Sequence, residues 1–199
     1  MTGREIQAAI CVALAKSFKA GQVVPEWNMR KGAEDTFRDA LSYAPRLDIA
    51  IGPFNLSFQN RVEDAERIRT FEHPLIERLK RAIERQNRDG VFRNPNPRCL
   101  VAIEVEHCTS SKHILGGITN ASMLGLLGVV VGSSSHFVKV RRIHDYACKL
   151  KQVGKALNDM FGNVACFEET EFLDFLNAGR RQANGKRRVS SPPADQNRH

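Results

Sequence analysis

The sequence predicts an α/β fold, a three-layer sandwich in which helices cover both faces of a central mixed β-sheet. Helical and strand-like patterns alternate along the 199 residues, which is typical of this class. One strand pattern, Leu126 to Val131, is a continuous aliphatic run of the kind found in strands buried on both faces. With 42% hydrophobic residues, a chain of this length can build one core without disulfides.

The first half of the chain opens with a capping-box pattern. Thr2 and Glu5 precede the apolar positions Ile6 and Ile10, which predicts the start of a helix. Pro25 marks an edge or irregular strand. A charge-rich stretch with apolar residues at helical spacing is interpreted as a helical insertion and a candidate dimer contact. The expected elements are a helix over 3–19, strands over 22–28 and 47–51, and the helical insertion over 61–88.

In the second half, the strand over 100–106 alternates so that Glu104 and Glu106 share one face. The elements expected after it are a helix over 110–123, a strand over 126–131, a helix over 142–160, a strand over 163–168 and a short helix over 171–177. Beyond Gly179 there is little to bury. We therefore predict a single domain over 1–178 and a basic disordered tail over 179–199.

The net charge of +8 is unevenly distributed. Residues 180–199 carry six basic and one acidic side chain, which leaves only +3 for the remainder. The positive net charge indicates a polyanionic partner, although most of it lies in the tail and the body is nearly balanced, and we expect DNA. The five cysteines are scattered and the N-terminal residues lack a signal-peptide pattern, so we expect a cytoplasmic protein with reduced thiols.

The stretch 114–131 is apolar and long enough to cross a bilayer. Thr119, Asn120 and Ser122 near its middle, and the five glycines between Gly116 and Gly132, favour a helix followed by a buried strand. We therefore expect no membrane partner. A membrane-associated protein that uses 114–131 remains the less favoured alternative.

Three acidic residues form the strongest candidate site. Asp48 lies on a short strand after Pro45, and Glu104 and Glu106 lie 56 and 58 residues later on one strand face. Carboxylates held together without basic neighbours repel one another and are costly to desolvate. A divalent cation relieves both costs, and hard oxygen ligands suit Mg²⁺. Glutamates on a half-exposed strand face are the alternative interpretation.

The pattern Pro45-x-x-Asp48 followed by Glu104-x-Glu106 at the end of an apolar strand resembles the PD-(D/E)XK nuclease superfamily, which includes many restriction endonucleases. The resemblance covers residues 1–168 and implies a restriction-endonuclease-like fold. It also implies that Asp48, Glu104 and the backbone carbonyl of Val105 bind Mg²⁺, for which Mn²⁺ can substitute. Glu106 stands where the superfamily usually has lysine, as in its E-x-E variant, and is expected to bind metal or position water.

Basic residues complete the expected site. Lys112, at the start of the next helix, is a candidate for stabilising charge that develops on the phosphate. A solvated lysine is the alternative. The candidate DNA-backbone contacts, against the alternative of a solvated helix face and tail, are Lys139, Arg141, Arg142, Lys149, Lys186, Arg187 and Arg188.

The sequence thus predicts a Mg²⁺-dependent endodeoxyribonuclease, of the kind of a type II restriction enzyme, with a homodimer as one option. The main alternative is a non-catalytic DNA-binding module on the same fold. The sequence lacks the G-x-S-x-G pattern of serine hydrolases and the G-K-[ST] pattern of P-loop proteins, which removes two common competing functions.

Overall fold

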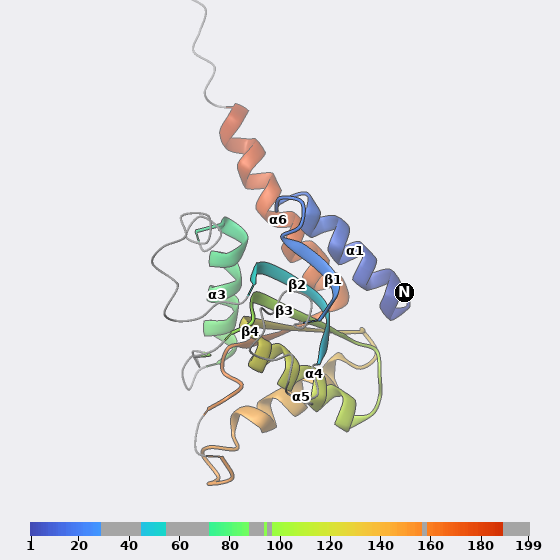
Figure 1. Ribbon diagram of the computed structural model, residues 1–199, viewed down its shortest axis with the longest axis vertical. Helices are drawn as coiled ribbons and strands as arrows, with labels where there is room; N and C mark the ends of the chain where they lie inside the picture. The colour runs from blue at the N-terminus through green and yellow to red at the C-terminus, as the bar shows by residue number, and fades with distance from the viewer. Residues whose placement is uncertain (29–44, 55–71, 88–93, 95–96, 157–158, 189–199) are drawn as a thin grey trace, which may run out of the picture.

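The computed structural model describes residues 1–28, 45–54, 72–87, 94, 97–156 and 159–188, with side chains as far as residue 178 (Figure 1). Helices and strands alternate as the sequence predicts. The elements are α1 Gly3–Ala15, β1 Val23–Asn28, β2 Arg46–Phe54, α3 Pro74–Gln86, β3 Cys99–Glu106, α4 Ser111–Leu124, β4 Gly125–Gly132, α5 Phe137–Cys148, β5 Val164–Glu168 and α6 Glu169–Arg188.

The strands form one five-stranded sheet in the order β1-β2-β3-β4-β5. β2 pairs antiparallel with both β1 and β3, whereas β4 pairs parallel with both β3 and β5. The two parallel pairs are each connected through a helix, as parallel pairing requires. The prediction of an α/β fold with a mixed central sheet is confirmed.

The helices cover the sheet in two layers (Figure 1). One core lies under α1, α3 and α6, where Ile6, Ile10 and Leu14 of α1 pack with sheet residues such as Ile103. A second core lies on the opposite face, where α4 and α5 pack against β4 and β5. Apolar residues every three or four positions give each helix one buried face. The fold is therefore a three-layer α/β arrangement.

Two helices differ from the predicted ranges. α5 begins at Phe137 and ends at Cys148, earlier than the predicted 142–160, and Gly154 lies beyond its end with φ of 71°. α6 covers 169–188 instead of 171–177, so residues 179–188 are helical and the prediction of disorder there is wrong. Arginine and lysine, which make up half of that stretch, are good helix formers. The rest of the predicted tail, 189–199, lies outside the described residues.

α3 belongs to the core, not to a peripheral insertion. Pro74 is its first residue, and the ring of His73 caps it by accepting a hydrogen bond from the Leu75 backbone N–H. Its apolar face, which includes Ile76 and Ile83, is buried in the same core as α1 and α6. That face is therefore not available for the predicted dimer contact. Residues 61–71 of the predicted insertion lie outside the described residues.

The end of α3 also lies against the outer edge of β5. The side-chain amide of Gln86 donates to the Cys166 carbonyl at 3.0 Å and accepts from the Cys166 N–H at 2.8 Å. Asn87 donates to the Val164 carbonyl at 2.9 Å. Two side-chain amides thus make the hydrogen bonds that a further strand would otherwise make.

The apolar stretch 114–131 is divided between two elements. Residues 114–124 belong to α4, and β4 begins at Gly125. Among the described residues, no helix has the length and hydropathy needed to cross a membrane.

The junction between α4 and β4 leads to the first testable prediction. A Cβ on Gly125 would lie 2.3 Å from the Leu127 carbonyl oxygen and 2.9 Å from the Ala102 Cβ, whereas a Cβ on Gly116 would meet nothing within 4 Å. We expect Gly125→Ala to lower the free energy of unfolding by about 3 kcal/mol through overpacking. Gly116→Ala should leave it unchanged or raise it by up to ~1 kcal/mol. Urea denaturation measures both, and equal effects would contradict the prediction.

Candidate metal centre

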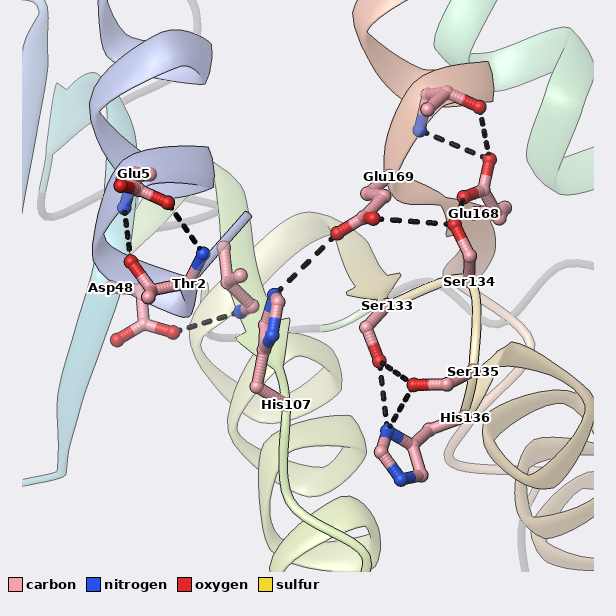
Figure 2. A network of polar contacts seen from close by, with 12 residues as sticks. Thr2, Glu5, Asp48, His107, Ser133, Ser134, Ser135, His136, Glu168 and Glu169 are labelled. Atoms are coloured by element: carbon pink, nitrogen blue, oxygen red, sulfur yellow. Dashed lines mark hydrogen bonds and ion pairs between the residues drawn. The ribbon is translucent and has the colours of Figure 1, made fainter.

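β2 and β3 stop pairing where the acidic residues lie. At this end, the last pair in register is Ile49 with Ile103, although both strands continue. The next position would place Asp48 opposite Glu104. Instead of a strand carbonyl, the Asp48 carboxylate accepts the hydrogen bond from the Val105 N–H at 2.8 Å. Figure 2 shows this carboxylate beside the first turn of α1. The side chains of Asp48 and Glu104 are also joined by a hydrogen bond, so the two acids are in contact where the strand pairing ends.

The three predicted acids influence one another. Glu104 is only 6% exposed, and burial raises its pKa to about 9, with a further upward contribution from the Asp48 charge and a smaller one from Glu106. Burial is also the main cause that raises the pKa of Asp48 and of Glu106. Oε1 of Glu104 is buried without a hydrogen-bond partner among the described residues. The structure thus brings together the three acids that the sequence singled out.

One face of α4 forms another wall of the site. Asn120 makes a hydrogen bond to the Glu104 side chain that opposes the rise in its pKa. The charge of His113 similarly opposes the rise in the pKa of Glu106. A Cβ on Gly117 would lie 2.0 Å from Oε1 of Glu106, so the carboxyl group fits against the bare helix backbone. Sequence analysis missed these three residues, although their spacing of four and three positions places them on one helix face.

An open cavity of about 800 Å³ leads to Asp48 from the opposite side, between α1 and the β1–β2 pair. Arg4 and Arg46 line it together with Asp48. Gln7 fixes this wall by donating to the Asp48 backbone carbonyl at 2.7 Å and to Glu26 at 2.9 Å. Glu26 also pairs with Arg46 at 2.8 Å. The cavity thus combines access to a carboxylate with two guanidinium groups.

These residues fit a hard divalent cation. Among the described residues, no three His, Cys, Asp or Glu side chains are placed to hold a metal ion together. Mg²⁺ needs fewer, because it usually binds one or two carboxylates and keeps several waters. The N–H and C=O of a strand residue point to the same neighbouring strand, so the Val105 carbonyl points toward β2, on the side of Asp48. The unpartnered Glu104 oxygen and the three raised pKa values are features that a cation would relieve.

Other predicted residues are not part of this arrangement. Lys112 is exposed on α4, about 100° around the helix from His113, and thus off the face that meets the acids. The Glu5 carboxylate accepts from the Thr2 N–H at 2.7 Å in the expected capping box (Figure 2). Its role is to cap α1.

The predicted DNA contacts are dispersed. Lys139 donates to the Thr109 carbonyl, in the loop between β3 and α4, so it lies at the same sheet end as the acids. Arg141 instead donates to Gln86 at 2.7 Å beside β5, while Arg142 and Lys149 are exposed. The residues 186–188 end α6, a helix about 30 Å long that begins at the end of β5. Their side chains lie outside the described part of the chain.

A polar network joins the loops that follow the parallel strands (Figure 2). His107, which follows β3, lies 3.7 Å from the Glu169 carboxylate at the start of α6. Ser134, which follows β4, donates to Glu169 at 3.2 Å. These contacts hold the three strand ends together next to the acidic site.

Comparison of the chain with protein-family models, with curated proteins and with solved structures gives no match.

Proposed function

We propose that the protein is a Mg²⁺-dependent nuclease with a restriction-endonuclease-like fold of the E-x-E type, which hydrolyses phosphodiester bonds in DNA. One observation carries the proposal. Asp48 and Glu104, which are 56 residues apart in the sequence, meet where β2 and β3 separate, and the Glu104 carboxyl group has a buried oxygen without a partner among the described residues.

Each residue has a defined role in this proposal. Asp48, Glu104 and the Val105 carbonyl hold the metal ion. When bound, Mg²⁺ polarises the phosphodiester and lowers the pKa of a coordinated water. Glu106, whose pKa is raised by burial, accepts a proton from the attacking water at the side of α4. Asn120 orients the Glu104 carboxyl group through its hydrogen bond.

The cavity beside Asp48 supports a phosphate-bearing substrate. Arg4 and Arg46 come from different elements and line the same space. A guanidinium group offers several donors in a planar fork that matches phosphate oxygens. Arg46 uses its Nε on Glu26, and as far as the described residues go its terminal nitrogens are available for a phosphate. The net charge of +8 favours a polyanion over a small neutral substrate.

The test is to incubate the full chain with supercoiled plasmid, linear duplex, single-stranded DNA and RNA in Mg²⁺, Mn²⁺ or EDTA. We expect cleavage of DNA in Mg²⁺ and none in EDTA. Asp48→Asn should lower the rate by about 10³-fold or more, since a metal ion contributes several kcal/mol to the transition state. The exposed Asp174→Asn, a matched change on α6, should cleave normally.

Two outcomes would contradict the proposal. One is that no nucleic acid is cleaved in any divalent cation. The other is that Asp48→Asn cleaves as fast as the natural chain. Salt-dependent DNA binding that needs no metal and survives Asp48→Asn, without cleavage, would favour the non-catalytic module instead.

A further inference from the structure

A second cavity, of about 580 Å³, lies between α3 and α6, away from the acidic residues. Three arginines of α3, Arg78, Arg81 and Arg85, line it together with Phe175 of α6. Their spacing of three and four residues places them on one helix face. Glu84 is the one acidic residue that lines the cavity, among the described residues, so its wall has a surplus of positive charge.

Arg78 is held in position by α6. Its Nη2 donates to the Phe175 carbonyl, and its guanidinium carbon lies 4.3 Å from the centroid of the Phe175 ring. Its Nη1 is buried without a hydrogen-bond partner among the described residues. Desolvation lowers the pKa of Arg78, because burial disfavours its charge. Arg78 therefore places a fixed positive charge in the cavity wall. The Phe175 carbonyl and ring compensate only part of this charge.

Arg81 and Arg85 are exposed and stand one helical turn apart. Like charges at this spacing destabilise a helix by a few tenths of a kcal/mol. Packing gives no reason for them, because the buried face of α3 is made by its leucines, isoleucines and alanine. A negatively charged ligand in the cavity would relieve this repulsion and balance the part of the Arg78 charge that Phe175 does not compensate.

The chemistry favours phosphate groups over carboxylates of an acidic protein. The three arginines follow one another along α3 at rises of about 4.5 and 6 Å, which suits the successive charges of a nucleic-acid backbone. Arginine in place of lysine supplies the planar fork that binds phosphate oxygens bidentately. The backbone of α6 continues past this cavity through a stretch rich in arginine and lysine.

We infer that the cleft between α3 and α6, lined by Arg78, Arg81 and Arg85, is a binding site for the phosphate backbone of a nucleic acid, separate from the metal centre. Binding there holds the nucleic acid on the layer of helices α1, α3 and α6. It requires neither a divalent cation nor hydrolysis, so it stands apart from the proposed nuclease activity.

The test measures binding of fluorescein-labelled single-stranded and duplex oligonucleotides to the full chain in EDTA, by anisotropy over a range of salt concentrations. We compare Arg81→Gln/Arg85→Gln with Lys16→Gln/Lys151→Gln, which removes the same charge at two exposed sites outside the cavity. We expect the arginine pair to weaken binding about tenfold or more. The slope of log K against log salt should fall by about 1.4 for the single strand and 1.8 for the duplex.

Equal affinity and equal slope for the two double variants would overturn the inference. So would displacement of the oligonucleotide by polyglutamate at the same charge concentration, because that would indicate an acidic protein as the partner. The assay contains EDTA and therefore measures binding without cleavage. A cleavage failure with intact binding would therefore count against the nuclease alone.

Discussion

Glu104→Gln is expected to stabilise the metal-free protein at neutral pH and to abolish its cleavage of nucleic acid. The pKa of Glu104 is raised from an ordinary 4.5 to about 9 by burial. Between these two pH values the folded protein keeps a proton that the unfolded chain has lost. The free energy of unfolding therefore falls as pH rises from about 4.5 to 9. Glutamine is neutral over this whole pH range, so the variant does not lose this free energy of unfolding as the pH rises.

At pH 7.5 the free energy of unfolding of Glu104→Gln should exceed that of the natural chain by on the order of 3 kcal/mol. Urea denaturation at pH 5 and pH 8, both in EDTA, measures it. The natural chain should be less stable at pH 8, and the difference between the two pH values should shrink in Glu104→Gln. The exposed Glu171→Gln serves as the matched control. An unchanged pH dependence in Glu104→Gln would show that this carboxyl group titrates normally.

Metal binding should have the opposite effect on the protonation of Glu104. Mg²⁺ favours the ionised carboxylate, so binding at pH 7.5 should release about one proton per site and stabilise the natural chain. A pH indicator detects the release. Glu104→Gln should neither release this proton nor gain stability from Mg²⁺. Proton release that persists in the variant would place the metal elsewhere.

Gly117→Ala should lower the cleavage rate by about 100-fold with little effect on stability. The added Cβ would lie 2.0 Å from Oε1 of Glu106, so the carboxyl group must move. That group is the end of a flexible side chain, so the fold accommodates the change, and alanine is the better helix former by ~1 kcal/mol. A displacement of about 1 Å can nevertheless cost 10²-fold in rate. Plasmid cleavage in Mg²⁺ and urea denaturation measure the two effects.

The neighbouring Gly116→Ala is the control, because a Cβ there meets nothing within 4 Å. It should cleave at the natural rate. If Gly117→Ala also cleaves at the natural rate, Glu106 has no role in the reaction.

That Glu104 and Glu106 lie together was predictable from the sequence, because two-residue periodicity is a local property of strands. The alternation over 100–106 places Glu104 and Glu106 on one face wherever the strand lies in the sheet. Asn120, His113 and Gly117 were not foreseen, because their approach depends on how α4 is rotated about its axis when it packs on β3. That rotation is set by contacts of Ile114 and Ile118 with the sheet core.

The order of the elements was also predictable, whereas their ends were not. The last helix extends through a polar stretch because its first turns are fixed by Phe172 and Leu176 in the core. A long helix of good helix formers can continue from such an anchor, and composition alone does not distinguish it from a disordered tail. α3 was similarly judged by its charges, although its buried face makes it part of the main core.

The amides of Gln86 and Asn87 have a consequence for self-association. They occupy backbone groups of β5 that another copy of the chain would need for intermolecular strand addition. At the opposite border, which is β1, Pro25 has no N–H to donate. Glu26, with φ of 50°, interrupts the extended backbone with which an added strand would pair. Continuous β-polymerisation is therefore disfavoured at both borders of the described sheet.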